Sequence, residues 1–132
     1  MMDALYPRLL VSRFPECFRF YDGVLTEALG GTRAKGEPSG PYANWGLGDQ
    51  SLLSLLDRAM MAGVVGDLRP PAPSDAAMLV LTVGDVDAAA ACGERHGGRV
   101  VAAPAARPEW GPTVRTAHLR DPDGNLLEFQ SY

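Results

Sequence analysis

The chain has 132 residues, a length that fits one compact domain with a sizeable core. Its 46% apolar and 21% charged residues are ordinary for a soluble globular protein. A net charge of −4 with no basic run argues against a nucleic-acid partner, and no stretch reaches the roughly 18 apolar residues that span a membrane. The N-terminus lacks the basic-then-apolar order of a signal peptide, and both cysteines fall in predicted helices, so we expect a reduced, cytoplasmic protein.

The first half of the chain is typical of a strand, a helix and three more strands. Residues 5–12 predict a strand in which Pro7 marks a start or an edge. Apolar residues then recur at helical spacing from Phe14 to Ala28, and Gly30-Gly31 predicts the end of that helix. Gly23 weakens the helical signal at its middle. The remaining elements of this half are expected as strands over 32–37, 42–48 and 51–57 and a short apolar helix over 58–65.

The second half repeats this plan after a linker over residues 66–75, whose prolines favour an extended, stiff chain. Asp85 suits the N-cap of an alanine-rich helix, and Gly97-Gly98 ends that helix as Gly30-Gly31 ended the first. The elements of this half are expected as a strand over 78–83, a helix over 86–96 and a strand over 99–103, followed by a loop and two closing strands. This internal repeat predicts an α+β fold of two βαβββ modules.

The two closing strands, from Arg115 to Gln130, are predicted to form a hairpin around Asp121-Pro122-Asp123-Gly124. Pro122 presets φ in the turn, Asp121 accepts backbone N–H groups, and Gly124 supplies a left-handed residue. A three-residue loop of this kind pairs Asp121 with Asn125 and sets His118 opposite Glu128. One face of the hairpin is apolar and predicts a covering helix, whereas the other is either wet or the lining of a cavity. The polar face carries Thr116, His118, Arg120, Glu128 and Gln130.

The segment Arg-Asp-Pro-Asp-Gly-Asn-Leu-Leu-Glu-Phe at 120–129 resembles the closing hairpin of the vicinal oxygen chelate superfamily. That superfamily includes glyoxalase I, bleomycin-resistance proteins, fosfomycin-resistance proteins and extradiol dioxygenases. The internal repeat matches its tandem modules, and Phe-Tyr-Asp-Gly-Val-Leu at 20–25 resembles its first helix. The resemblance implies a curved mixed sheet whose polar face lines a cup. It divides a single glyoxalase-like domain, 1–132, into a module at about 4–65, the linker 66–75 and a module at about 76–132.

The resemblance also indicates where the enzymes of the superfamily hold a divalent metal. Counted along this chain, those positions fall on Tyr6, Met78 and Glu128, with a further one near Ser54. A carboxylate suits Zn, Ni, Mn or Fe, whereas a thioether is a poor ligand for them. We therefore expect no metal and no cofactor, with Glu128 as a ligand only if a metal is present.

His118 and Glu128 are the candidates for chemistry. A cross-strand hydrogen bond that satisfies both groups in a partly buried cup is one interpretation. The other is that the imidazole acts as a general base or anchors the hydroxyl of a ligand.

Four further side chains lie on or near the expected cup. Arg8 shares its strand face with Tyr6 and can pair with Glu128 or with an anionic ligand. Trp45 can stack on a flat ligand or pack in the core, and Trp110 can stack or anchor its own loop.

These observations predict a metal-free binding protein of the bleomycin-resistance type, rather than an enzyme, that holds a drug-like or metabolite molecule in a cup associated with a homodimer. The alternative is a lyase, isomerase or dioxygenase of the same superfamily with an atypical site on His118 and Glu128. A third hypothesis is a regulatory or chaperone-like dimer with a vestigial cup. Neither a nucleic acid nor a membrane is expected as a partner. The expected ligand-binding residues are Tyr6, Arg8, Trp45, Thr116, His118 and Glu128.

Overall fold

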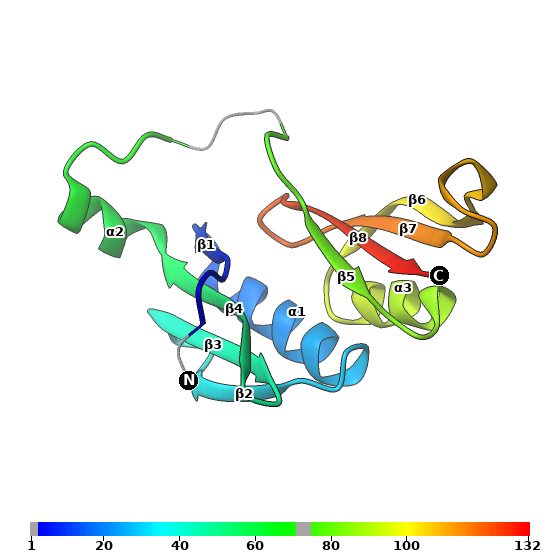
Figure 1. Cartoon of the computed structure of the whole chain (residues 1–132). Coiled ribbons are helices and arrows are strands. Elements are labelled where there is room, and N and C mark those ends of the chain that lie inside the picture. The colour runs from blue at the N-terminus through cyan, green and yellow to red at the C-terminus, as the bar shows by residue number, and fades with distance from the viewer. Residues whose placement is uncertain (1–2, 71–74) are drawn as a thin grey trace.

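The structure is a computed structural model that describes residues 3–70 and 75–132 (Figure 1). The first module contains β1 (Arg8–Val11), α1 (Phe14–Glu27), β2 (Thr32–Gly36), β3 (Tyr42–Leu47) and β4 (Gln50–Asp57), and α2 (Arg58–Val65) follows it. The second contains β5 (Leu79–Thr82), α3 (Val86–Arg95), β6 (Arg99–Ala106), the 3-10 helix η1 (Pro108–Trp110), β7 (Arg115–Arg120) and β8 (Leu126–Ser131). The predicted α+β fold with two βαβββ modules is confirmed.

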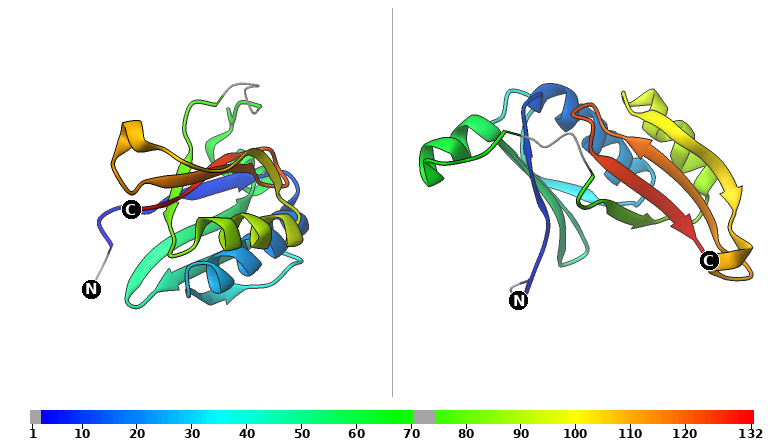
Figure 2. Two further views of the ribbon diagram at one scale, coloured as in Figure 1. Left: turned by 90° about the vertical axis from the view of Figure 1, so that its right-hand side faces the viewer. Right: turned by 90° about the horizontal axis from the view of Figure 1, so that it is seen from above.

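Each module forms its own four-stranded mixed sheet. The strand orders are β1-β4-β3-β2 and β5-β8-β7-β6, so the strands correspond one to one between the modules. In both sheets the first strand runs parallel to the last, and the other neighbours are antiparallel. The helices α1 and α3 lie side by side between the two sheets (Figures 1 and 2).

Two strands differ from the prediction by more than one residue at an end, β1 and β6. The first is shorter than residues 5–12, because only Arg8–Val11 pairs in register with β4. The strand β6 continues past 103 to Ala106, through Pro104. It can do so because it is an edge strand with an irregular register, where a missing N–H breaks no ladder. Of the predicted linker, residues 71–74 lie outside the described residues.

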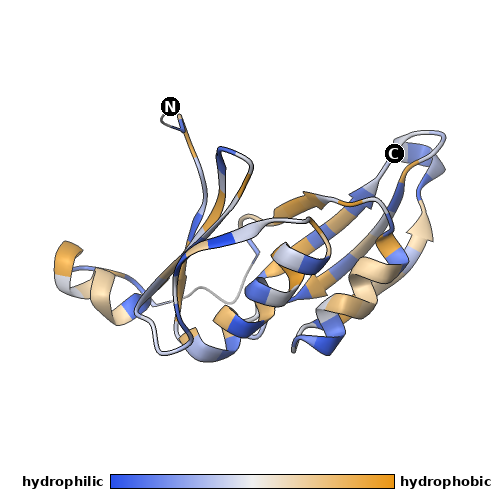
Figure 3. Cartoon of the chain, turned by 90° about the horizontal axis from the view of Figure 1, so that it is seen from below, coloured by the Kyte–Doolittle hydropathy of each residue, from blue (hydrophilic) through white to orange (hydrophobic). Residues whose placement is uncertain are grey.

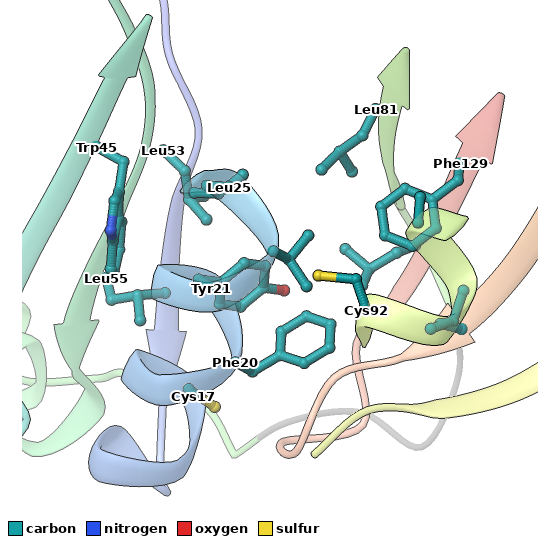
Figure 4. Packing of buried hydrophobic residues seen from close by; sticks show 14 of the residues in the cluster. Cys17, Phe20, Tyr21, Leu25, Trp45, Leu53, Leu55, Leu81, Cys92 and Phe129 are labelled. Carbon is teal, nitrogen blue, oxygen red and sulfur yellow. The ribbon is translucent and has the colours of Figure 1, made fainter. Parts of the chain in front are cut away.

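The buried side chains of α1 and α3 meet the inner faces of both sheets (Figure 4). On the second sheet the predicted apolar face is fully buried beneath α3, which confirms the expected covering helix; its members are Ala117, Leu119, Leu127 and Phe129. On the first sheet Trp45 is buried against Phe18, and its indole N–H donates to Asp22 at 3.0 Å. The expectation that Trp45 lines the cup is therefore wrong, because it points to the helix side of β3.

The closing hairpin has the predicted turn and register. The Asp121 N–H donates to the Asn125 carbonyl at 2.9 Å, and Gly124 has a φ of +96°. The Asp121 carboxylate accepts the backbone N–H groups of Asp123 and Asn125, at 2.9 Å each. Asp-Pro-Asp-Gly is thus a structural turn.

This hairpin loop also fastens the second module to the first. The Asp123 carboxylate accepts the N–H groups of Ser12 and Arg13 at the start of α1, at 3.2 and 3.0 Å. It therefore caps a helix that belongs to the other module. Deeper in the contact, the Tyr21 hydroxyl donates to the buried Asp121 carboxylate at 2.5 Å.

The helix α2 has no buried side chain, in contrast to α1 and α3. It is nevertheless apolar, as its colouring in Figure 3 shows, and Met60, Val64 and Val65 are exposed on it. Within residues 3–70 and 75–132, no helix has the length and apolar character needed to cross a membrane.

Candidate functional site

The polar face of β7 and β8 centres on a bonded pair. His118 and Glu128 are register partners, and the imidazole Nε2 lies 2.9 Å from a Glu128 carboxylate oxygen. Their side chains are only 16% and 10% exposed. The predicted cross-strand hydrogen bond between His118 and Glu128 is therefore confirmed. Because α3 covers the opposite face of these strands, both polar groups point away from the core.

Arg107 covers another part of this face, a role that no motif in the sequence predicted. Thr116 is fully buried, and its hydroxyl accepts a hydrogen bond from Arg107 Nε at 3.1 Å. The Arg107 guanidinium also lies 5.3 Å from the centre of the Trp110 ring, which is 56% exposed. Trp110 therefore contacts a cation at the rim of the face. Arg120 is held elsewhere, in a bidentate pair with Asp75 that keeps the pKa of that carboxyl below its usual range.

The first sheet carries a second polar cluster. The Arg8 guanidinium donates to the Ser54 hydroxyl at 2.8 Å and to the Tyr6 hydroxyl at 3.1 Å. It also lies over the rings of Tyr6 and Tyr42, at 5.8 and 5.5 Å from their centres. Arg8 thus binds partners of its own module, and the alternative pairing with Glu128 is not the one observed.

The two clusters occupy equivalent places in the repeat. Register across the first sheet aligns Arg8, Ser54 and Asn44, and register across the second aligns Val80, Glu128 and His118. Asn44 is therefore the counterpart of His118. Its Oδ1 atom is buried and accepts no hydrogen bond from the described residues. A buried acceptor without a donor is costly, so this oxygen is an unusual feature of the first sheet.

An apolar cleft of about 400 Å³ lies where the two modules approach each other. Its wall includes Tyr21 and Leu25 of α1 and Leu81 of β5, which belong to the buried core, so the cleft lies on the helix side of the sheets. Pro7 and Val80 are the parts of the wall next to Arg8 in the chain and to Glu128 in the sheet. This volume is within the range of small-molecule pockets, which combine apolar walls with a few polar groups.

The metal positions implied by the resemblance do not fit a metal here. The Ser54 oxygen accepts from a cationic guanidinium, which repels a metal cation at that point. On β5 the register neighbour of Glu128 is Val80, two residues after Met78, and neither side chain suits a hard divalent ion. Glu128 itself is engaged by His118.

Comparison with known proteins agrees with this architecture. The family model of the glyoxalase/bleomycin resistance protein/dioxygenase superfamily matches residues 5–129. The uncharacterized protein YraH of Bacillus subtilis is 33% identical over 131 residues, 97% of each chain. A glyoxalase-related enzyme from Fulvimarina pelagi matches with a TM-score of 0.77 at 16% identity, over all of this chain and 89% of that one. A glyoxalase/bleomycin resistance protein from Albidiferax ferrireducens matches with a TM-score of 0.73 at 19% identity, over 96% of both chains. The chain therefore belongs to the glyoxalase/bleomycin resistance protein/dioxygenase superfamily.

Proposed function

We propose that the two modules act as one glyoxalase-like domain that binds a small molecule without a metal, as bleomycin-resistance-type members do. The observation that carries this proposal is the sheltered pair of His118 and Glu128 on a sheet face that points away from the core. Burying polar groups at this depth costs free energy of folding. Binding of a ligand would explain why the chain keeps them there.

The ligand is a drug-like or metabolite molecule with an apolar, partly aromatic body and hydrogen-bonding groups. Val80, which is half exposed beside Glu128, offers an apolar contact for the body, and Tyr6 and Tyr42 offer ring faces for stacking. The Glu128 carboxylate can accept a donor from the ligand, while Arg8 attracts an anionic or π-rich group.

The second part of the proposal is a homodimer. The apolar side chains of α2 and the exposed Met78 and Val80 near the edge strand β5 are surfaces that a second copy would cover. Two-fold pairing is the commonest way for a chain to bury such surfaces.

A double-mutant cycle tests the pair. We expect His118→Ala and Glu128→Ala to be coupled by about 0.5–3 kcal/mol in stability, because neighbours fail additivity. In a ligand screen, both variants should weaken the same hits. The matched control pairs His118→Ala with Glu109→Ala, a carboxylate in another element, and should be additive. Additive effects at His118 and Glu128, together with unchanged binding, would remove the site from this face.

The alternative is a lyase, isomerase or dioxygenase, and the same hydrogen bond favours it, since a carboxylate orients an imidazole for proton transfer. In that case His118→Gln would abolish turnover while ligand affinity remained within a few-fold of the wild type. A stoichiometric metal that disappears with Glu128→Ala would contradict the metal-free proposal.

A further inference from the structure

Three potential metal ligands meet on the helix side of the molecule, where α1 contacts α3. Glu27 lies at the end of α1, and Cys92 and His96 lie one helical turn apart at the end of α3. The His96 Nε2 atom is 2.9 Å from one Glu27 carboxylate oxygen, and the Cys92 sulfur is 3.3 Å from the other. One ligand atom from each residue can be chosen so that all three lie within 4.8 Å of one another.

We propose that Glu27, Cys92 and His96 form a zinc site that clamps the first module to the second. The donors are one thiolate, one imidazole and one carboxylate, a set that suits Zn²⁺. The site lies on the opposite side of the second sheet from His118 and Glu128, and it is independent of the proposed ligand-binding function.

The spacing of the donors fits a tetrahedral ion. Bond lengths of about 2.3 Å to sulfur and 2.0 Å to nitrogen or oxygen put neighbouring ligand atoms about 3.5 Å apart. The sulfur-to-carboxylate distance of 3.3 Å is close to this value. The imidazole contacts the other carboxylate oxygen at 2.9 Å, so the Glu27 carboxylate has to turn to offer one oxygen to the ion. A separation of four residues on a helix places Cys92 and His96 on one face. The fourth position is left to water.

The packing of the helices holds two of the donors in place. A Cβ atom on Gly23 would lie 2.3 Å from the His96 ring, so the imidazole occupies space that only glycine leaves open. Figure 4 shows the Cys92 side chain directed from α3 toward α1. Beside the cluster, a surface depression of about 450 Å³ lined by Glu27, Cys92 and Arg95 admits solvent and ions.

Three groups must change state when zinc binds. The His96 Nε2 atom faces a carboxylate oxygen, which only accepts hydrogen bonds, so its proton has to move to Nδ1 or leave to solvent before Nε2 can bind the metal. The Arg95 guanidinium donates to Glu27 at 2.9 Å and has to release that oxygen. Burial and the hydrogen bond to Glu27 raise the pKa of the Cys92 thiol to about 11, so the metal takes the thiolate while the proton leaves to solvent. Loss of the thiol proton also ends its hydrogen bond to Glu27, which frees a lone pair of that carboxylate for the ion.

Cobalt and zinc titrations of metal-free full-length protein test the site. Co²⁺ should bind one per chain and give a sulfur-to-metal charge-transfer band, and Zn²⁺ should displace it. Zn²⁺ at about a hundredfold excess over its Kd should raise the Tm by about 5–10 °C, because it binds only the folded chain. The variants Cys92→Ser, His96→Gln and Glu27→Gln should each lose about a hundredfold in affinity, since even outer-shell changes cost 10–100-fold.

Matched controls separate this site from others. Cys17→Ala removes the other buried cysteine, and His118→Ala together with Glu128→Ala disables the sheet-face pair; both should bind Co²⁺ as the wild type does. Arg95→Gln should tighten binding several-fold, because it removes the competitor for Glu27. If Cys92→Ser fails to fold, Cys92→Ala replaces it. Binding that survives the Cys92 change, or no charge-transfer band in the wild type, would overturn the proposal. Metal lost only with Glu128→Ala would instead place it in the cup.

Discussion

Tyr21 joins the two modules through a buried hydrogen bond. Its hydroxyl is the side-chain donor from α1 to the buried Asp121 carboxylate. We predict that Tyr21→Phe destabilises the protein by about 1–3 kcal/mol at pH 7, because it removes a donor from a buried charge. Urea denaturation measures the change. Tyr132→Phe, at an exposed tyrosine, is the control and should change stability by less than about 0.5 kcal/mol.

The same residue sets a response to alkaline pH. Burial, and then the charge of Asp121, raises the pKa of Tyr21 well above 10. The stability contributed by this raised pKa is complete below pH 10 and is lost as the pH rises above 10 toward the folded-state value. Stability measured from pH 9 upward should therefore fall less steeply in Tyr21→Phe than in the wild type. Parallel curves would show that Tyr21 is not the group that titrates.

At the scale of elements, the packing of α3 against α1 explains why a glycine, Gly23, stands inside α1. Glycine costs about 1 kcal/mol relative to alanine inside a helix, so Gly23→Ala alone should help α1. The His96 ring makes that change unfavourable, because the added Cβ atom would lie 2.3 Å from it. We predict that Gly23→Ala destabilises the wild type by about 1–3 kcal/mol.

A His96→Ala protein tests whether the ring is the reason that Gly23→Ala is destabilising. In a His96→Ala protein the ring is absent, and Gly23→Ala should become neutral or stabilising by up to about 1 kcal/mol. Gly63→Ala, in α2 where nothing lies near the added atom, is the matched control. The measurement is chemical denaturation of metal-free protein in both backgrounds. A loss of the same size in both would mean that His96 does not set the packing distance between α1 and α3.

At the scale of the whole molecule, the exposed apolar helix α2 bears on assembly. If a second copy covers it, Val64→Asp should shift the protein from dimer toward monomer, because an unpaired charge in an apolar interface is costly. Ala91→Asp on the exposed side of α3 should leave the assembly unchanged. Light scattering over a range of protein concentrations reads the mass. A wild-type monomer throughout, or a Val64→Asp dimer as stable as the wild type, would contradict the homodimer.

Much of the fold could be predicted because its signals are local. The turn Asp-Pro-Asp-Gly fixed the hairpin register, and with it the opposition of His118 and Glu128, through backbone chemistry within four residues. The repeat of strand, helix and paired glycines indicated two equivalent modules, because each module must bury its own apolar face.

The candidate site was predicted only in part, because alternation along a strand says which residues share a face but not which face is inward. Tyr42 and Trp45 lie on opposite faces of β3, and both are aromatic, so the sequence alone could not tell which one entered the core. Likewise, the pairing of Glu128 with Val80 on β5 could not be predicted, since parallel register between distant segments has no local signal.

The sequence by itself therefore determined the elements, their order, the closing hairpin and the polarity of its two faces. Only the tertiary structure decided that Asp123 caps α1, that Arg8 binds Ser54, and that Gly23 makes room for His96 beside Glu27 and Cys92. The physical reason is that the residues in these contacts lie far apart in the sequence. Each of these contacts joins segments more than 40 residues apart, and their geometry follows from how the modules pack rather than from any local propensity.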